Sequence, residues 1–351
     1  MTSAHPAAAA IDATRARLSE ALDPLVPAGA EVALVDFPHH SNVGDSAIWV
    51  GEQAHLGRRG VRVAYRCTWR TYDAATMRRR LGRDGVVLVH GGGNFGDLYR
   101  RHQQLRERVL ADSAGRLVVQ LPQTVNFSTP AALEAFTRAH GTRDDLVLLV
   151  RDTESRDLLA GSLARPPVLA PDMVFALGPR QRTVPAEQDV LALLRTDHES
   201  AGLLDQAAAL GLDAVDWLDH RRDGDGSVAD RALDLAGRGD RRLTERTGRA
   251  LAAVAGAGLD RRAVREVARG EALLSRGRVV VTDRLHAHLL SYLMGIPHVV
   301  LADRHAKVTR ASRLWVGEHP WIRTASTVEE AVVLAQELLA GPLSAEGAAG
   351  G

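Results

Sequence analysis

The feature of this sequence that most restricts its fold is a repeated alternation of short apolar runs with segments of helix length. In the first half of the chain the runs are Val32–Phe37, Val61–Arg66, Val86–His90, Leu117–Leu121 and Leu146–Arg151. Each run is apolar almost throughout, which indicates strands that are covered on both faces. Helix-length stretches such as Ser46–Leu56, Leu98–Asp112 and Pro130–His140 separate the runs. This alternation predicts a doubly wound parallel sheet.

A second series of the same kind follows a proline-rich stretch around residues 166–185, where we place a domain boundary. Its runs are Val190–Arg195, Ala214–Trp217, Val279–Thr282 and His298–Leu301. The length of 351 residues fits two domains of about 150 residues each. We therefore expect two Rossmann-like α/β domains, at residues 1–180 and 186–340, and a flexible tail at 341–351. The carboxyl ends of their strands should face each other across a ligand cleft.

Composition excludes several classes of protein. Hydrophobic residues make up 45% of the chain and charged residues 25%, which supports a sizeable core and excludes disorder, collagen and coiled coils. A net charge of +1 is too balanced for binding nucleic acid through counterion release. The single cysteine, Cys67, excludes a disulfide within the chain and a cysteine-based zinc cluster. Since apolar runs of signal-peptide or membrane-spanning length are missing, we expect a cytoplasmic protein.

Polar residues that could bind a ligand follow the first predicted strand. Asn42, Gly44 and Asp45 form a strand-to-helix loop with typical turn residues, and the backbone N–H groups of such a loop face the cleft. A helix-capping role for Asp45 alone is an equally good interpretation. His39 and His40, beside them, are expected at the surface.

A glycine-rich loop is expected after the third predicted strand. Gly91, Gly92 and Gly93 let the backbone approach a ligand closely, because glycine has no Cβ, and Asn94 follows them. The spacing is not that of a dinucleotide-binding loop, and no P-loop lysine follows. A tight turn without a ligand is the alternative.

Arginines stand at the ends of further strands. Arg151 ends the strand at 146–151, and Arg195, followed by Asp197 and Glu199, ends the strand at 190–195. The planar guanidinium group suits a carboxylate or a phosphate that enters the cleft. An ordinary ion pair of Arg151 with Asp152 or Glu154, and a plain capping turn at Thr196 or Asp197, are the alternatives.

The most informative motif joins Arg284 to His286 at the start of the helix after the strand at 279–282. Arginine binds anions, and histidine exchanges protons near neutral pH. A capping Asp283 with a packed histidine is the alternative. His286 and His288 are two residues apart and cannot share a helix face, so we expect no metal site there. Lys307 is the only lysine of the chain and follows another strand, either as a binding residue or by chance.

Taken in order, these motifs resemble those of the polysaccharide pyruvyl transferases. The set consists of Asn42-x-Gly44-Asp45, Gly91-Gly92-Gly93-Asn94, Pro122-Gln123, Arg151-Asp152, Arg195-x-Asp197-x-Glu199, Arg284-Leu285-His286 and Lys307. The resemblance covers about residues 32–307. It implies a fold similar to the GT-B glycosyltransferases and the formation of pyruvate ketals on sugars from phosphoenolpyruvate. It assigns Arg284 and His286 to the donor and the chemistry, and the other motifs to substrate binding.

The expected reaction needs no cofactor and no metal. Phosphoenolpyruvate would lie in a box formed by Arg151, Arg195 and Arg284, and His286 would be the acid. The acceptor would be a glycan or a lipid-linked sugar, with at most peripheral contact to the inner face of the cell membrane. We expect no nucleic acid partner and leave a homo-oligomer open.

Two other functions remain possible from the sequence. A nucleotide-sugar glycosyltransferase of the GT-B type would need a carboxylate for the ribose late in the second domain, which the Arg284–His286 turn fits less well. A sugar-binding protein without activity would not need Arg284 and His286, and aromatic residues for sugar stacking are few at 4%. The charged composition of Asp219–Arg262 predicts exposed helix and loop. This stretch matches no motif of the family, so the sequence assigns it no contacts to the acceptor.

Overall fold

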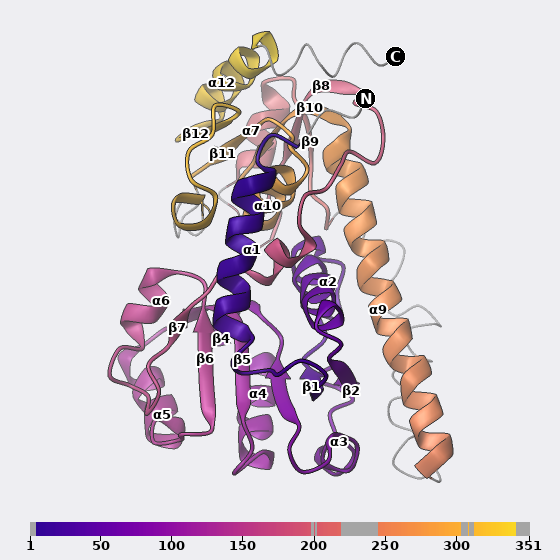
Figure 1. The fold of residues 1–351 in the computed structure, drawn as a ribbon. Coiled ribbons are helices and arrows are strands. Elements are labelled where there is room, and N and C mark those ends of the chain that lie inside the picture. Colours follow the sequence, from indigo (N-terminus) through magenta and orange to yellow (C-terminus); the bar gives the residue numbers. More distant parts are fainter. Residues whose placement is uncertain are drawn as a thin grey trace.

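The computed structural model describes residues 5–197, 200, 202–218, 245–302, 308 and 312–341. Glu199, Lys307, the tail after residue 341 and most of the charged stretch 219–262 lie outside the described residues. The described chain forms two parallel sheets with helices on both faces (Figure 1).

The N-terminal sheet has seven strands, in the order β2-β1-β3-β5-β6-β7, with β4 paired to β5 beyond the end of β3. All of these pairs are parallel. The strands are β1 (Glu31–Val35), β2 (Arg62–Cys67), β3 (Val86–Val89), β4 (Gly92–Gly96), β5 (Val118–Asn126), β6 (Leu146–Val150) and β7 (Val168–Leu169). The helices that connect them are α2 (Val43–Arg58), α3 (Ala74–Leu81), α4 (Arg100–Asp112), α5 (Pro130–His140) and α6 (Thr153–Leu158).

The C-terminal sheet has five parallel strands in the order β12-β11-β10-β8-β9. They are β8 (Gln188–Leu193), β9 (Asp213–Val215), β10 (Gly277–Thr282), β11 (His298–Leu301) and β12 (Ile322–Ala325). The helices of this half are α7 (Leu203–Ala209), α9 (Glu245–Ser275), α10 (Leu285–Leu293) and α12 (Val328–Ala340), with a π-helical turn η4 at Ser312–Val316. No helix in the described part of the chain is long and apolar enough to span a bilayer.

Successive residues of the central strands are buried on opposite faces, as the apolar runs predict. Val32 and Leu34 of β1 belong to one hydrophobic cluster, and Ala33 and Val35 belong to another. The C-terminal sheet repeats the arrangement, with Leu191 on one side of β8 and Ala192 on the other. Continuous apolar strands are thus explained by helices that cover both faces.

Several elements connect the two sheets. The N-terminal helix α1 (Ala8–Leu22), α2 and the 3-10 helix η1 (Met173–Leu177) contribute Ile11, Ala47 and Phe175 to the cluster that also covers one face of β8 and β10. The long helix α9 packs on α2 and β2 and also contacts β10, and Figure 1 shows it running alongside both halves. The expected fold class, two Rossmann-like parallel sheets in a GT-B-like arrangement, is confirmed. The limits proposed for the domains stay a prediction.

The strand orders locate the ligand site. In an open α/β sheet, ligands bind at the carboxyl ends of the strands where the strand order reverses. The order reverses between β1 and β3 in the N-terminal sheet and between β8 and β10 in the C-terminal sheet. The segments that leave these four strands carry four of the seven motifs that the sequence singled out, those around Asn42, Gly92, Arg195 and Arg284.

Candidate active site

Loops from both reversal points enclose a pocket of about 260 Å³, near the lower end of small-molecule sites, which begin at about 300 Å³. Its walls bring together nine residues that the sequence predicted: Asn42, Asp45, Gly93, Asn94, Arg151, Arg195, Asp197, Arg284 and His286. The other lining residues are His40, Ser41, Tyr99, His102, Trp217, Leu218 and Leu285. Gly44 and Gly92 lie directly behind this wall, against His286 and Asp45 respectively.

His286 lies in the first turn of α10, and Arg284 is the residue that precedes this helix. The Nε2 atom of His286 is 3.3 Å from Oδ2 of Asp172, and Nη1 of Arg151 donates to the same oxygen at 2.5 Å. Asp172 also caps η1 by accepting from the backbone of Val174. Burial would raise the pKa of Asp172, but the charges of His286 and Arg151 outweigh it and hold this pKa well below its usual range. Asp172 is therefore a carboxylate that holds the imidazole in place.

Gly44 was expected to be a turn residue, but Asn42 makes the turn at the start of α2. Gly44 instead leaves space for a neighbouring side chain. Asn42 caps α2 by accepting from the N–H of Gly44 at 3.1 Å and donates to Oδ2 of Asp45 at 2.9 Å. Gly44 itself is already helical. A Cβ at Gly44 would lie 2.4 Å from Nδ1 of His286, so only glycine lets the ring pack this close to α2.

Asp45 is a residue of the pocket as well as a residue of the first helical turn. Burial would raise its pKa, but the neighbouring histidines, above all His40 and His286, outweigh burial and lower it. Asp45 thus adds a negative charge beside the imidazole of His286.

The expectation of a loop over the glycine motif is wrong, because Gly92–Gly96 forms the strand β4. A Cβ at Gly91 would lie 2.8 Å from the carbonyl oxygen of Pro122, which explains why glycine is needed where the chain lies against β5. Gly92 has a φ of +121°, a conformation that side-chain-bearing residues rarely adopt. At Gly93 a Cβ would lie 3.3 Å from Nη2 of Arg151, so glycine opens the space in front of this guanidinium.

The three predicted arginines all line the pocket, but each one has an acidic partner. Arg195 donates to both carboxylate oxygens of Asp197, at 2.9 and 3.0 Å, and Arg284 donates to Asp216 at 2.6 Å. Arg151 pairs with Asp172 and not with a neighbour in sequence. The backbone N–H of Ser200 donates to the carbonyl oxygen of Asp197 at 2.8 Å. The alternative of a capping turn at Thr196 or Asp197 stays a prediction, because residues 198 and 199 lie outside the described residues. The pairs fix the guanidinium planes, and they also neutralise much of the positive charge that the sequence suggested.

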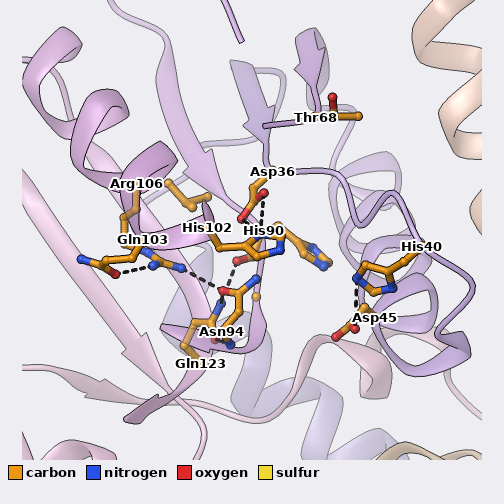
Figure 2. Close-up of polar contacts among 12 residues, drawn as sticks. Asp36, His40, Asp45, Thr68, His90, Asn94, His102, Gln103, Arg106 and Gln123 are labelled. Atoms are coloured by element: carbon orange, nitrogen blue, oxygen red, sulfur yellow. Dashed lines mark hydrogen bonds and ion pairs between the residues drawn. The ribbon is translucent and has the colours of Figure 1, made fainter. Parts of the chain in front are cut away.

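The sequence analysis missed His102, and it expected His40 at the surface. The side chain of His40 is 40% exposed and also lines the pocket, 3.6 Å from Oδ2 of Asp45. Nδ1 of His102 lies 2.8 and 2.9 Å from the oxygens of Asp36, a buried residue with a φ of +73° (Figure 2). His102 and Asp36 are 66 positions apart, so no local pattern could reveal this pair.

Two further histidine contacts lie behind the pocket. His90 contacts both oxygens of the buried Glu52 at 3.0 Å; burial alone would lower the pKa of His90, but the charge of Glu52 raises it. His288 turns away from His286 and contacts His298 at 2.7 Å in the core. Within the described residues no group of three His, Cys, Asp or Glu side chains is arranged to hold a metal ion.

Comparisons with known proteins show what the chain is similar to. A sequence model described as polysaccharide pyruvyl transferase matches residues 42–305. Pyruvyl transferase 1 of Schizosaccharomyces pombe is 34% identical over 310 residues, which cover 82% of this chain and 70% of that protein. EpsO of Bacillus subtilis, whose name carries pyruvyl transferase as a provisional activity, is 28% identical over 316 residues, 88% of this chain and 92% of that one.

Among solved structures, that of an uncharacterised protein from Klebsiella pneumoniae superposes with a TM-score of 0.54 at 15% identity. The match covers 90% of this chain and 99% of that one, and it supports the fold alone.

Proposed function

The chain belongs to the polysaccharide pyruvyl transferase family, and we propose that it moves the pyruvyl group of phosphoenolpyruvate to a sugar diol, forming a pyruvate ketal. The observation that carries this proposal is the position of His286. It is held by Asp172, closely packed on Gly44, and placed in one pocket with three arginines from both sheets.

Phosphoenolpyruvate presents a carboxylate and a phosphate on one carbon of a vinyl group, so its site must supply donors for two anionic groups. Arg284 suits this task, because its buried Nε has no hydrogen-bond partner within the described residues. The guanidinium also lies over the ring of Trp217, 5.5 Å from the ring centre, which fixes its plane. Its ion pair with Asp216 keeps the charge compensated when no donor is bound.

The reaction requires a proton at the terminal vinyl carbon and two new bonds from oxygen to the carbon that bears the phosphate. We assign the proton donation to His286. The carbon next to the new methyl group then becomes cation-like, the first sugar hydroxyl attacks it, phosphate leaves, and the second hydroxyl closes the ketal. Of the two hydroxyl protons, one balances the proton gained by the methyl group and the other leaves with the phosphate.

The surrounding residues assist this sequence by position and charge. General acid catalysis of this kind contributes about 10²- to 10⁴-fold. Asp172 holds Nε2 of the ring as a carboxylate, and the missing side chain of Gly44 leaves room for the ring beside α2. Arginine guanidinium groups stabilise the charge that develops on the departing phosphate.

The proposal is tested by incubating the purified protein with phosphoenolpyruvate and a panel of galactosides, glucosides and mannosides. Release of inorganic phosphate that depends on the sugar, together with a product heavier by one pyruvate less one water, supports it. A nucleotide-sugar glycosyltransferase would instead consume nucleotide sugars and release a nucleotide. Such a result, without any use of phosphoenolpyruvate, would contradict the proposal.

A further inference from the structure

A buried arginine lies under the floor of the pocket. Arg106 on α4 has only 2% of its surface exposed, and its guanidinium lies over the ring of Phe95, 4.4 Å from the ring centre. It donates to Oε1 of Gln103 at 2.7 Å and to Oδ1 of Asn94 at 2.9 Å (Figure 2). It also donates to Oε1 of Gln120 at 2.8 Å. Each nitrogen of the guanidinium thus has one hydrogen-bond partner, and all three partners are neutral groups.

This arrangement differs from that of Arg151, Arg195 and Arg284, which all have carboxylate partners. In the described part of the chain no hydrogen bond of Arg106 ends on an acid, and the carboxylates of Asp36 and Glu107 act on it only from a longer range. Burial lowers its pKa to about 10, so it remains a cation at neutral pH. Because a buried charge is costly unless an opposite charge compensates it, the floor of the pocket is suited to an anion.

The hydrogen bonds of Asn94 fix which end of its amide faces the pocket. Its Oδ1 accepts both from Nη2 of Arg106 and from Nε2 of Gln123, the latter at 3.0 Å. Two donors on one atom identify that atom as the oxygen and direct the NH₂ group away from them. Since Asn94 is a partly exposed residue of the pocket lining, this NH₂ group is available to a ligand.

A second open donor belongs to Arg151, which lines the same pocket. Arg151 uses Nε for Thr124, at 2.9 Å, and Nη1 for Asp172. Its Nη2 makes no hydrogen bond to any residue that the structure describes, and it lies at the position that a Cβ of Gly93 would crowd. Asn94 and Arg151 are thus both residues of the pocket lining, and the missing side chain of Gly93 leaves the space beside Nη2 of Arg151 open.

We infer that Asn94 and Arg151 form a subsite for one anionic group of the donor, its carboxylate or its phosphate, and that Arg106 is a positioning residue for it. Arg106 holds the amide of Asn94 with NH₂ toward the ligand and provides the positive charge behind it. The inference rests on the proposed function only in taking phosphoenolpyruvate as the donor.

The variant Asn94→Asp tests the subsite. It keeps the oxygen that accepts from Arg106 and Gln123, and it replaces NH₂ with an anionic oxygen that repels an anion. Because Arg106 gains a carboxylate partner, the variant should be at least as stable to urea as the wild type. Loss of a charge-assisted hydrogen bond should weaken binding of phosphoenolpyruvate by about 10- to 100-fold in calorimetry. The control Asn126→Asp, on β5 and not in the pocket lining, adds the same charge and should bind normally.

Inorganic phosphate and pyruvate, titrated separately, identify the anionic group. If Asn94→Asp loses phosphate binding, the subsite holds the phosphate, and if it loses pyruvate binding, the subsite holds the carboxylate. Wild-type affinity of Asn94→Asp for all three ligands would overturn the inference, as would a wild-type protein that binds none of them. A wild-type protein that binds phosphate or pyruvate through Asn94, but not phosphoenolpyruvate, would refute the proposed function and leave the subsite standing.

The role of Arg106 is tested by coupling. Arg106→Gln should weaken phosphoenolpyruvate binding more in the wild-type background than when Asn94 is already Ala, because only the wild type also loses the orientation of the amide. A purely structural role predicts equal losses in both backgrounds. Arg106→Lys, which keeps the charge, should restore part of the affinity. If Arg106→Gln does not fold, Arg106→Lys and the Asn94→Asp titration still decide the inference.

Discussion

Replacing Gly44 by alanine tests how closely the chemistry depends on the position of His286. The new Cβ would lie 2.4 Å from Nδ1, whereas ordinary contact begins at 3.4 Å, so the ring or the helix must move by about 1 Å. A helix backbone packed in the core yields less readily than a side chain, and we expect the ring to move. A misplacement of this size costs about 10²-fold in rate when it affects a catalytic group.

The same change should have only a small effect on stability, so a loss of activity can be distinguished from a loss of folded protein. Overpacking costs about 1–3 kcal/mol, but alanine is favoured over glycine inside a helix by about 1 kcal/mol. The net loss in free energy of unfolding should thus be at most about 2 kcal/mol, measurable in urea. The kcat for phosphate release from phosphoenolpyruvate, with acceptor present, should fall about 10²-fold in the folded variant.

Gly57 in the last turn of α2 is the matched control. No atom lies within 4 Å of a Cβ at this position, so Gly57→Ala should raise stability by about 0.5–1 kcal/mol and leave kcat unchanged. A folded Gly44→Ala protein with wild-type kcat would refute the reasoning, since it would show that kcat does not depend on the position of the His286 ring.

Three further predictions concern single residues. Arg284→Lys keeps the charge opposite Asp216 but loses the planar group over Trp217, so donor affinity should fall at least about tenfold in calorimetry. Burial raises the pKa of Asp283 to about 6, so the carboxyl binds its proton more tightly in the folded state. The free energy of unfolding in urea should therefore fall by about 3 kcal/mol between about pH 4 and pH 7. Asp283→Asn should remove most of this pH dependence, and an unchanged pH dependence would contradict the prediction. Burial raises the pKa of the Cys67 thiol to about 12, so iodoacetamide at about pH 8 should label Cys67 only when urea unfolds the chain.

Much of the fold follows directly from the sequence, because buried parallel strands leave a continuous apolar run. The strand β11 at His298–Leu301 and the helix α5 at Pro130–His140 have the predicted bounds. The strand β4 was missed because glycine has no side chain to produce an apolar pattern, and its pairing depends on contact with β5. The three-residue strand β9 is shorter than the run that predicts it.

The candidate site was predictable to the extent that strand ends meet at one edge of a sheet. This rule brings Arg195 and His286 together at the edge of the C-terminal sheet, and Asn42 joins them in the pocket because the two sheets face each other. It does not give the partners of these residues, because pairs such as His286 with Asp172, 114 positions apart, depend on how the two sheets pack together. The acid that pairs with Arg151 is likewise Asp172, 21 positions away, and not the neighbouring Asp152 or Glu154 that the sequence offered.

The measurement that tests the central claim most directly is the reaction in deuterium oxide, with phosphoenolpyruvate and a sugar acceptor. Protonation of the vinyl carbon by His286 predicts a pyruvate ketal whose methyl group carries one deuterium, formed together with phosphate, and no such product from His286→Ala. A ketal without deuterium, phosphate release that yields only free pyruvate, or full activity of a folded His286→Ala protein would contradict the account.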